Sequence, residues 1–244
     1  LNTNLVFRFL TYCNNITIGP GAKLSMGDAD LNVTADMTIS GQVEQTNINA
    51  DFFVGDDVFW LSGSTANITQ NGEFHVTGDW EFRNGSAAVL THGYVYFEGT
   101  SISYIRSYET NCAFYNLLNS KDNTSLYFSS SSTDTLKING YLDNVNSTST
   151  FYFNTTYPLV LKGQLYNNGH IVCPYGTFIF DGTAYTVNLN TGDYFNNLII
   201  SSTGNTSLSV SLRIYGELTI SRGSLVSNNY PILIKGDWDN QVGA

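Results

Sequence analysis

Aspartates in short acidic turns are the side chains of this sequence best suited to holding a metal ion. The turns read "GDADLN", "GDD" and "GDWDN". Calcium takes carboxylate and carbonyl oxygens as ligands. An EF-hand loop beginning at Asp28 is excluded, because Val33 and Ile39 stand where that loop needs glycine and glutamate. We expect either turn aspartates that accept backbone N–H bonds or a calcium site. The candidate ligands are Asp28, Asp30, Asp56, Asp57, Asp237 and Asp239.

Catalytic residues do not cluster in the sequence. The histidines His75, His92 and His170 share no spacing, and the lysines are scattered along the chain. General acid–base catalysis needs convergent titratable groups, and no nucleophile-elbow, Walker or zincin pattern is present. We expect a protein that is not an enzyme and needs no cofactor other than calcium. A carbohydrate-active β-helix enzyme is the minor alternative.

Two covalent modifications have candidate residues. Three cysteines are too few for a disulfide scaffold and match no zinc spacing. They are either buried thiols or include one disulfide, for which Cys112 and Cys173 are the candidates. Eight Asn-x-Ser/Thr sequons occur, where composition alone predicts about six. The candidate glycosylation sites are Asn15, Asn32, Asn67, Asn84, Asn123, Asn146, Asn154 and Asn205.

Charge and hydropathy exclude two classes of partner. The net charge is −10 and no cluster of Lys and Arg exists, so the electrostatic footprint of a nucleic-acid-binding protein is missing. No apolar run reaches the roughly 18 residues of a membrane-spanning helix. Only 12% of residues are charged, while 28 are asparagine. This amide- and hydroxyl-rich composition indicates an extracellular or cell-surface location.

Internal repeats organise the chain. "YCNNITI" (12–18) matches "YFNNLII" (194–200), and "FYNLL" (114–118) carries the same Asn before an apolar residue. Similar segments follow each match, including "LRIYGELTIS" and "LKINGYLD". Repetition at this scale is typical of stacked architectures. We expect one repetitive domain over 1–244, with module copies at about 12–100, 112–183 and 194–244.

Short alternating strands point to an all-β fold. Segments such as "YVYF", "SLYFS" and "TFIFDG" alternate apolar and polar residues between Gly, Asn and Asp turns. Leu31 and Trp80 are 49 residues apart, whereas the matching Leu212 and Trp238 are 26 apart. The excess is close to one coil of a solenoid. We therefore predict a parallel β-helix (β-solenoid) of roughly 10 coils, with tandem antiparallel β-sandwich domains as the alternative.

The repeats resemble a known class of surface protein. The pattern FNNL, L-x-I-x-G-x-L-x-I, G-D-W-x-N and F-D-G-T is similar to repeats of filamentous-haemagglutinin-like proteins and other β-helical adhesins of bacteria and archaea. The resemblance covers nearly the whole chain and implies architecture rather than an activity. The first module departs from it at Cys13 and has "LVFRF" in place of the leading F-D-G-T segment.

The ends of a solenoid expose strand edges that can pair with another chain. Residues 1–11 are apolar and strand-like, and the third module stops where another strand is expected. We predict that 1–11 is exchanged with a neighbouring copy, giving a head-to-tail homopolymer by β-strand addition. The expected function is a structural subunit of an extracellular filament or surface layer. The alternative is the stalk or passenger of an adhesin that binds glycans.

Overall fold

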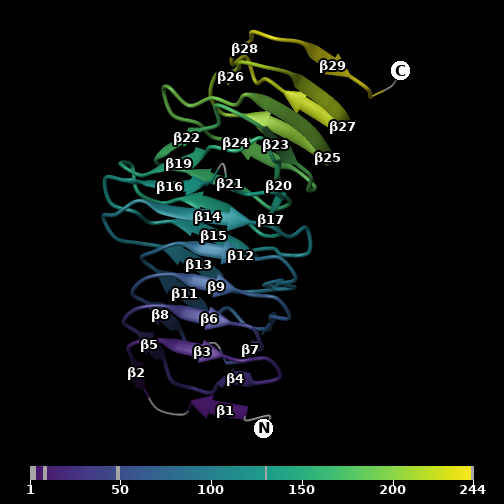
Figure 1. Ribbon diagram of the computed structural model, residues 1–244. Helices are drawn as coiled ribbons and strands as arrows, with labels where there is room; N and C mark the ends of the chain where they lie inside the picture. The colour runs from purple at the N-terminus through teal and green to yellow at the C-terminus, as the bar shows by residue number, and fades with distance from the viewer. Residues whose placement is uncertain (1–3, 8–9, 48–49, 130, 243–244) are drawn as a thin grey trace.

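The computed structural model confirms the all-β parallel solenoid, with about 11 turns (Figure 1). It describes residues 4–7, 10–47, 50–129 and 131–242. Every strand pair in these segments is parallel, which excludes the antiparallel sandwich. In the same segments there is no helix that could cross a membrane.

Most coils contribute a short strand to each of three faces. The first face is an eight-stranded sheet of β2 (Thr11–Cys13), β5 (Leu31–Val33), β8 (Phe52–Val54), β11 (Glu73–Val76), β13 (Tyr94–Phe97), β15 (Asn116–Asn119), β18 (Leu142–Asn144) and β21 (Leu165–Asn167). The second face is an eight-stranded sheet of β3 (Ile16–Ile18), β6 (Met37–Ile39), β9 (Val58–Trp60), β12 (Trp80–Phe82), β14 (Ser103–Ser107), β16 (Ser125–Phe128), β19 (Thr150–Phe153) and β22 (His170–Val172).

The third face is built from two sheets joined by isolated bridges. Its lower sheet contains β1 (Asn4–Phe7), β4 (Lys23–Met26), β7 (Gln42–Gln45) and β10 (Thr65–Ile68). Its upper sheet contains β17 (Leu136–Ile138), β20 (Leu159–Leu161), β23 (Thr177–Phe180), β25 (Asn197–Leu208), β27 (Leu218–Val226) and β29 (Trp238–Asn240). Bridges at Ala87, Ala113 and Phe114 connect the two sheets.

In the last coils, two long strands, β25 and β27, run across one corner. The first half of β25 pairs with β23, and its second half pairs with β24 (Tyr185–Val187). β25 and β27 therefore continue from the third face onto the first without a break. β26 (Leu212–Ile214) and β28 (Ile232–Ile234) pair with each other beside them.

At the other end of the stack, β1 pairs with β4 of its own chain, Leu5 lying opposite Leu24. Residues 1–3 and 8–9 of the segment predicted to exchange between copies lie outside the described residues.

The alternation in the sequence creates the core. Most strands alternate buried and outward residues: β5, β8 and β9 bury their first and third residues, and β4 and β11 bury their second and fourth. Because the coils are in register, identical positions stack: Phe52 and Phe74 lie ring on ring, with centroids 4.2 Å apart. Burying an aromatic side chain contributes roughly 1.5–3 kcal/mol through the hydrophobic effect. The inward columns are therefore the main source of stability.

Coil length varies, but the paired strands keep a continuous register except for two shifts between β25 and β27. Thr11 pairs with Leu31, 20 residues on, whereas Leu117 pairs with Leu142, 25 residues on. The additional residues lie in the turns at the corners. The segment in the first module that exceeds the third supplies β8 and β9, which form part of one ordinary coil.

The repeated asparagines of the sequence all perform one task at the corners. The Oδ1 atoms of Asn15, Asn116 and Asn197 each accept a hydrogen bond from a backbone N–H one coil on, at 3.0, 3.0 and 2.9 Å. They occupy three different corners, since Asn15 precedes β3 on the second face, Asn116 begins β15 on the first and Asn197 begins β25 on the third. The sequence repeat is therefore a corner motif and not a marker of one face.

The glycine that recurs in the repeat follows from this hydrogen bond. A Cβ at Gly140 would collide with Oδ1 of Asn116, and a Cβ at Gly216 would collide with Oδ1 of Asn197. The L-x-I-x-G pattern thus keeps open the space that the asparagine of the preceding coil fills.

A second set of asparagines forms a ladder inside the solenoid. Asn119, Asn144 and Asn167 occupy the inward position that valine and phenylalanine fill in lower coils. The Nδ2 of Asn119 donates to Asn144 at 2.8 Å, and that of Asn144 donates to Asn167 at 3.0 Å. The ladder ends on the fully buried carboxylate of Asp193, which also accepts from His170. A buried amide without partners costs about 1–3 kcal/mol, so each member depends on its neighbours.

The inward columns predict a contrast between two phenylalanines. Phe74→Ala should lower the free energy of unfolding by about 3–5 kcal/mol, because it leaves a cavity in the aromatic column. Phe59→Ala is the matched control, since Phe59 is the outward residue of β9 and should cost much less. Urea unfolding of both variants measures the difference. Equal losses would contradict the assignment of inward and outward faces.

The buried ladder predicts a second contrast. Asn144→Leu removes the acceptor of Asn119 and the donor to Asn167, together with the bonds to Ser149 and His170. It should destabilise the protein by about 2–4 kcal/mol, because several buried groups lose a partner. Asn84→Leu, at an exposed turn, should change stability by less than about 0.5 kcal/mol. Thermal and urea unfolding report both values, and a stable Asn144→Leu protein would show that the ladder is dispensable.

Candidate cation site

A row of carboxylate and carboxamide oxygens occupies the corner between the first and second faces. Asn15, Asp36, Asp57 and Asp79 stand directly before β3, β6, β9 and β12 in four successive coils. Each accepts a hydrogen bond from a backbone N–H of the next coil. The distances are 3.0 Å for Asn15, 3.3 Å for Asp36, 2.6 Å for Asp57 and 2.8 Å for Asp79. The row continues the pairing between coils through a corner where the sheets are interrupted.

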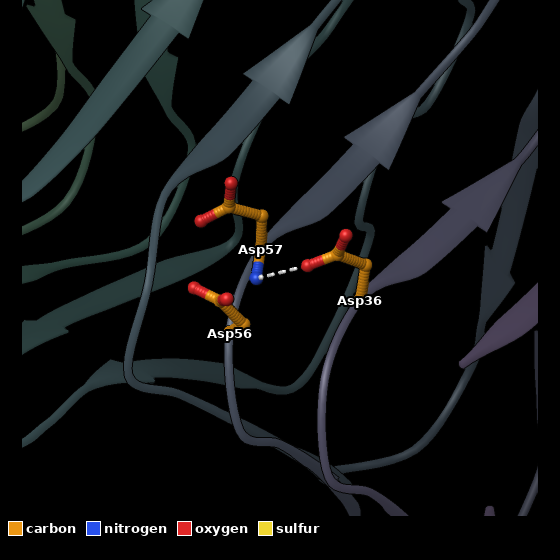
Figure 2. A group of neighbouring side chains, drawn as sticks. All are labelled: Asp36, Asp56 and Asp57. Carbon is orange, nitrogen blue, oxygen red and sulfur yellow. Dashed lines mark hydrogen bonds between the residues drawn. The ribbon is translucent and has the colours of Figure 1, made fainter. Parts of the chain in front are cut away.

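Three aspartates converge at the middle of this row. One carboxylate oxygen from each of Asp36, Asp56 and Asp57 lies within 4.8 Å of the others. Figure 2 shows the three side chains on two adjacent turns, with the hydrogen bond from the Asp57 N–H to Asp36. Asp56 is exposed, whereas Asp36 and Asp57 are half-buried. A glycine is required at position 78, because a Cβ there would collide with Oδ1 of Asp57.

The electrostatics of this cluster are unfavourable in the absence of a cation. Burial raises the pKa of Asp57, and the neighbouring charges of Asp79, Asp56 and Asp36 raise it further, while the N–H bond from Asp79 opposes the shift. Arg106 forms ion pairs with Asp79 at 2.7 Å and with Glu81 at 2.9 Å. In the described part of the chain, none of the ion pairs includes Asp36, Asp56 or Asp57.

Hard divalent cations are the ions that suit this arrangement of carboxylates. Calcium accepts six to eight oxygen ligands in flexible arrangements and often keeps water among them. Three carboxylates at an accessible corner supply part of such a shell and leave the rest to water. The three ligand groups of the cluster are all carboxylates, which are the oxygen ligands that such cations take.

The structure brings together only part of the predicted calcium ligands. Asp56 and Asp57 join the cluster, and Asp36, which the sequence analysis missed, completes it. Asp36 lies one coil before Asp57, at a separation of 21 residues, so the coil period was the signal that could have identified it.

The other four predicted ligands lie elsewhere. Asp28 is exposed in a bend, and Asp237 and Asp239 are exposed in the last coil. Asp30 belongs to a separate row, in which its Oδ1 accepts from the N–H of Asp51 at 3.1 Å. Asp51 in turn accepts from the N–H of Glu73 at 2.9 Å. These aspartates therefore serve, where they are bonded, as turn acceptors.

The predicted disulfide between Cys112 and Cys173 is absent from the structure, which contains three free thiols. Two complete coils, β15–β17 and β18–β20, separate the two residues. At ~4.8 Å per coil this exceeds the Cα separation of 4.4–6.8 Å that a disulfide spans. Burial raises the pKa of Cys173 to about 12 and also raises that of Cys112. Both thiols are therefore protonated and poorly reactive.

The candidate glycosylation sites differ in accessibility. The exposed asparagines are Asn15, Asn84, Asn123 and Asn205, and the half-buried ones are Asn32, Asn67, Asn146 and Asn154. The Nδ2 atom, which would carry the sugar, donates to Glu44 in Asn67 and to two backbone carbonyls in Asn146. The side chains of Asn67 and Asn146 thus have a structural role in the folded chain.

Comparison with known proteins returns no match to a family model, a curated protein or a solved structure. The resemblance to filamentous-haemagglutinin-like repeats therefore remains a prediction.

Calcium should stabilise the protein through the Asp36–Asp56–Asp57 cluster. At about ten times its dissociation constant, a ligand bound only by the folded state adds about 1.4 kcal/mol. We expect Asp57→Asn to abolish this gain, and Asp28→Asn, which changes an exposed aspartate outside the cluster, to retain it. Calorimetric melting with and without calcium tests both. A gain that survives Asp57→Asn would place the ion elsewhere.

Without calcium, the difference in melting temperature between Asp57→Asn and the wild type should depend on pH. Because the pKa of Asp57 is raised in the folded state, its carboxyl favours folding below its ordinary pKa, and this contribution is lost as the pH rises through the raised value. An asparagine keeps the acceptor oxygen, as Asn15 shows, without the charge. Asp57→Asn should therefore melt above the wild type at pH 7, and the difference should vanish below pH 4.

Proposed function

We propose that this chain is a non-enzymatic structural protein of the cell exterior whose molecules stack head to tail into a filament. The observation that supports the proposal is the last coil. Trp238 continues the core column formed by Leu198 and Leu218, yet its side chain is 64% exposed. The coil that contains Trp238 therefore presents a core-type apolar residue on which a further coil can stack.

Parallel coils make the opposite ends of one molecule complementary. A strand edge added above β28 and β29 has the same direction as the strand below it, so a second copy can continue the stack without reversal. Leu233 and Tyr230 add to the apolar surface of this coil. At the lower end, Val6, Leu10 and Tyr12 are also exposed. A contact between two different ends is heterologous and propagates into an open fibre.

The surface chemistry agrees with an exterior location. The net charge of −10 and the low share of charged residues suit a soluble polymer subunit, and four of the eight sequons carry an exposed asparagine. The alternative, a glycan-binding stalk, requires a recognition site on the side of the solenoid.

Electron microscopy of the purified protein should show fibres with an axial repeat of about 50 Å, from about 11 coils at ~4.8 Å each. Trp238→Asp should abolish them, because it places a charge in the contact. Tyr175→Asp, a change of a comparably exposed aromatic residue outside the last coil, should not. Monodisperse monomers, with and without calcium, would contradict the proposal, as would fibres formed by Trp238→Asp.

A further inference from the structure

The first face contains one break, and a groove lies across it. β21 is the last strand of the eight-stranded sheet, whereas the next strand on that side, β24, pairs with β25. The amide of Gln164, next to β21, spans the break by donating to the carbonyl of Ala184 at 2.7 Å. The groove has a volume of about 630 Å3. The strands beside it, β18, β21 and β24, lie in the teal-to-green part of the stack in Figure 1.

A carboxylate oxygen at one end of this groove lacks a partner. Asp143 is the outward residue of β18, and its Oδ1 is buried without a hydrogen-bond donor in the described part of the chain. Burial raises the pKa of this carboxyl. A buried oxygen without a donor costs about 1–3 kcal/mol, and such groups in native proteins call for an explanation. Asp143 also lines the groove, so its carboxyl group is placed to accept a hydrogen bond from a ligand once the ligand displaces the side chain from its buried position.

An exposed aromatic ring stands beside this oxygen. Tyr166 is the outward residue of β21, directly above Asp143 in the ladder, and its side chain is 51% exposed. Tyr141 holds the ring in place through an edge-to-face contact, with centroids 5.5 Å apart and an angle of 81° between the rings. The groove therefore has a rigid apolar surface adjoining a polar one.

The remaining polar side chains offer acceptors. Gln164 and Asn168 each donate through their amide nitrogen to a backbone carbonyl, which directs the nitrogen to the protein and leaves the amide oxygen available. Asn188 lies on the next coil across the break. None of the residues that line the groove is Lys, Arg or His, and Asp143 is its only charged member.

These features select a neutral, hydroxyl-rich ligand. A phosphate or carboxylate would be repelled by Asp143 without any compensating base. A bare metal ion is far smaller than the groove and would not pack against the ring of Tyr166. A sugar ring combines hydroxyl donors for Asp143 and the amide oxygens with an apolar C–H face for Tyr166, and mostly preformed clefts with a few placed polar groups are typical of ligand sites.

We propose that the groove at the break between β21 and β24 binds a neutral oligosaccharide, with Tyr166 as the stacking platform and Asp143 as the principal acceptor. The site lies on the side of the solenoid and does not depend on polymerisation, so either proposal can fail without the other.

The test is titration calorimetry of the full chain with neutral oligosaccharides of β-linked and α-linked hexoses and N-acetylhexosamines. We expect binding to at least one of them, weakened tenfold or more by Tyr166→Ala. Asp143→Asn preserves shape but replaces an acceptor with a donor, and should weaken binding by a similar factor. Tyr175→Ala, at a comparably exposed tyrosine outside the groove, should bind as the wild type does.

Each variant is checked for folding by its melting temperature, so that lost binding is not mistaken for lost structure. No binding of any neutral oligosaccharide at about 10 mM, a concentration at which even interactions worth about 3 kcal/mol are detected, would overturn the proposal. Binding that Tyr166→Ala retains would overturn it too. So would a preference for acidic over neutral sugars, because Asp143 would then oppose the ligand.

Discussion

Hydrogen bonding between successive coils is the constraint on which this structure depends. In a parallel solenoid each strand finds its backbone partners only in the coils above and below it, because no strand pairs within its own coil. At the corners the ladders stop, and the backbone must find other acceptors. The oxygens of Asn15, Asp36, Asp57 and Asp79 supply them at one corner. The coils are thereby held together through the turns as well as through the sheets.

This solution explains why the chain tolerates variation in some places and not in others. Coil length changes by several residues, because an acceptor at the corner needs only to face the N–H of the next coil. The inward columns tolerate less change in residue type, because each inward residue packs on the residues at the same position in the neighbouring coils. Where a column becomes polar, as it does from Asn119 to Asn167, the polar residues continue until a buried carboxylate, Asp193, terminates the series. The acidic cluster follows from the same rule, because two adjacent coils place aspartates at one corner.

The sequence was sufficient for the fold but only in part for the sites. Alternating strands and a length difference of about one coil predicted a parallel solenoid. The sequence repeat does not correspond to a whole number of coils, because Asn15, Asn116 and Asn197 lie at three different corners of the solenoid. Asp36 was not predicted as a ligand because it is 21 residues from Asp57 in the sequence, and only the winding of one coil brings the two together. The groove beside Tyr166 was not predictable, because it depends on β24 pairing with the following coil instead of the preceding sheet.

Hydrogen exchange of the corner amides is the most direct test of this account. The backbone N–H groups of Asp57, Asp79 and Tyr104 are bonded to side-chain oxygens of the preceding coil. We predict that they exchange as slowly as amides in the adjacent sheets, and that Asp57→Ala accelerates exchange at Asp79 more than at Tyr104. Exchange of all three at the rate of exposed turns would show that the corners do not hold the coils together.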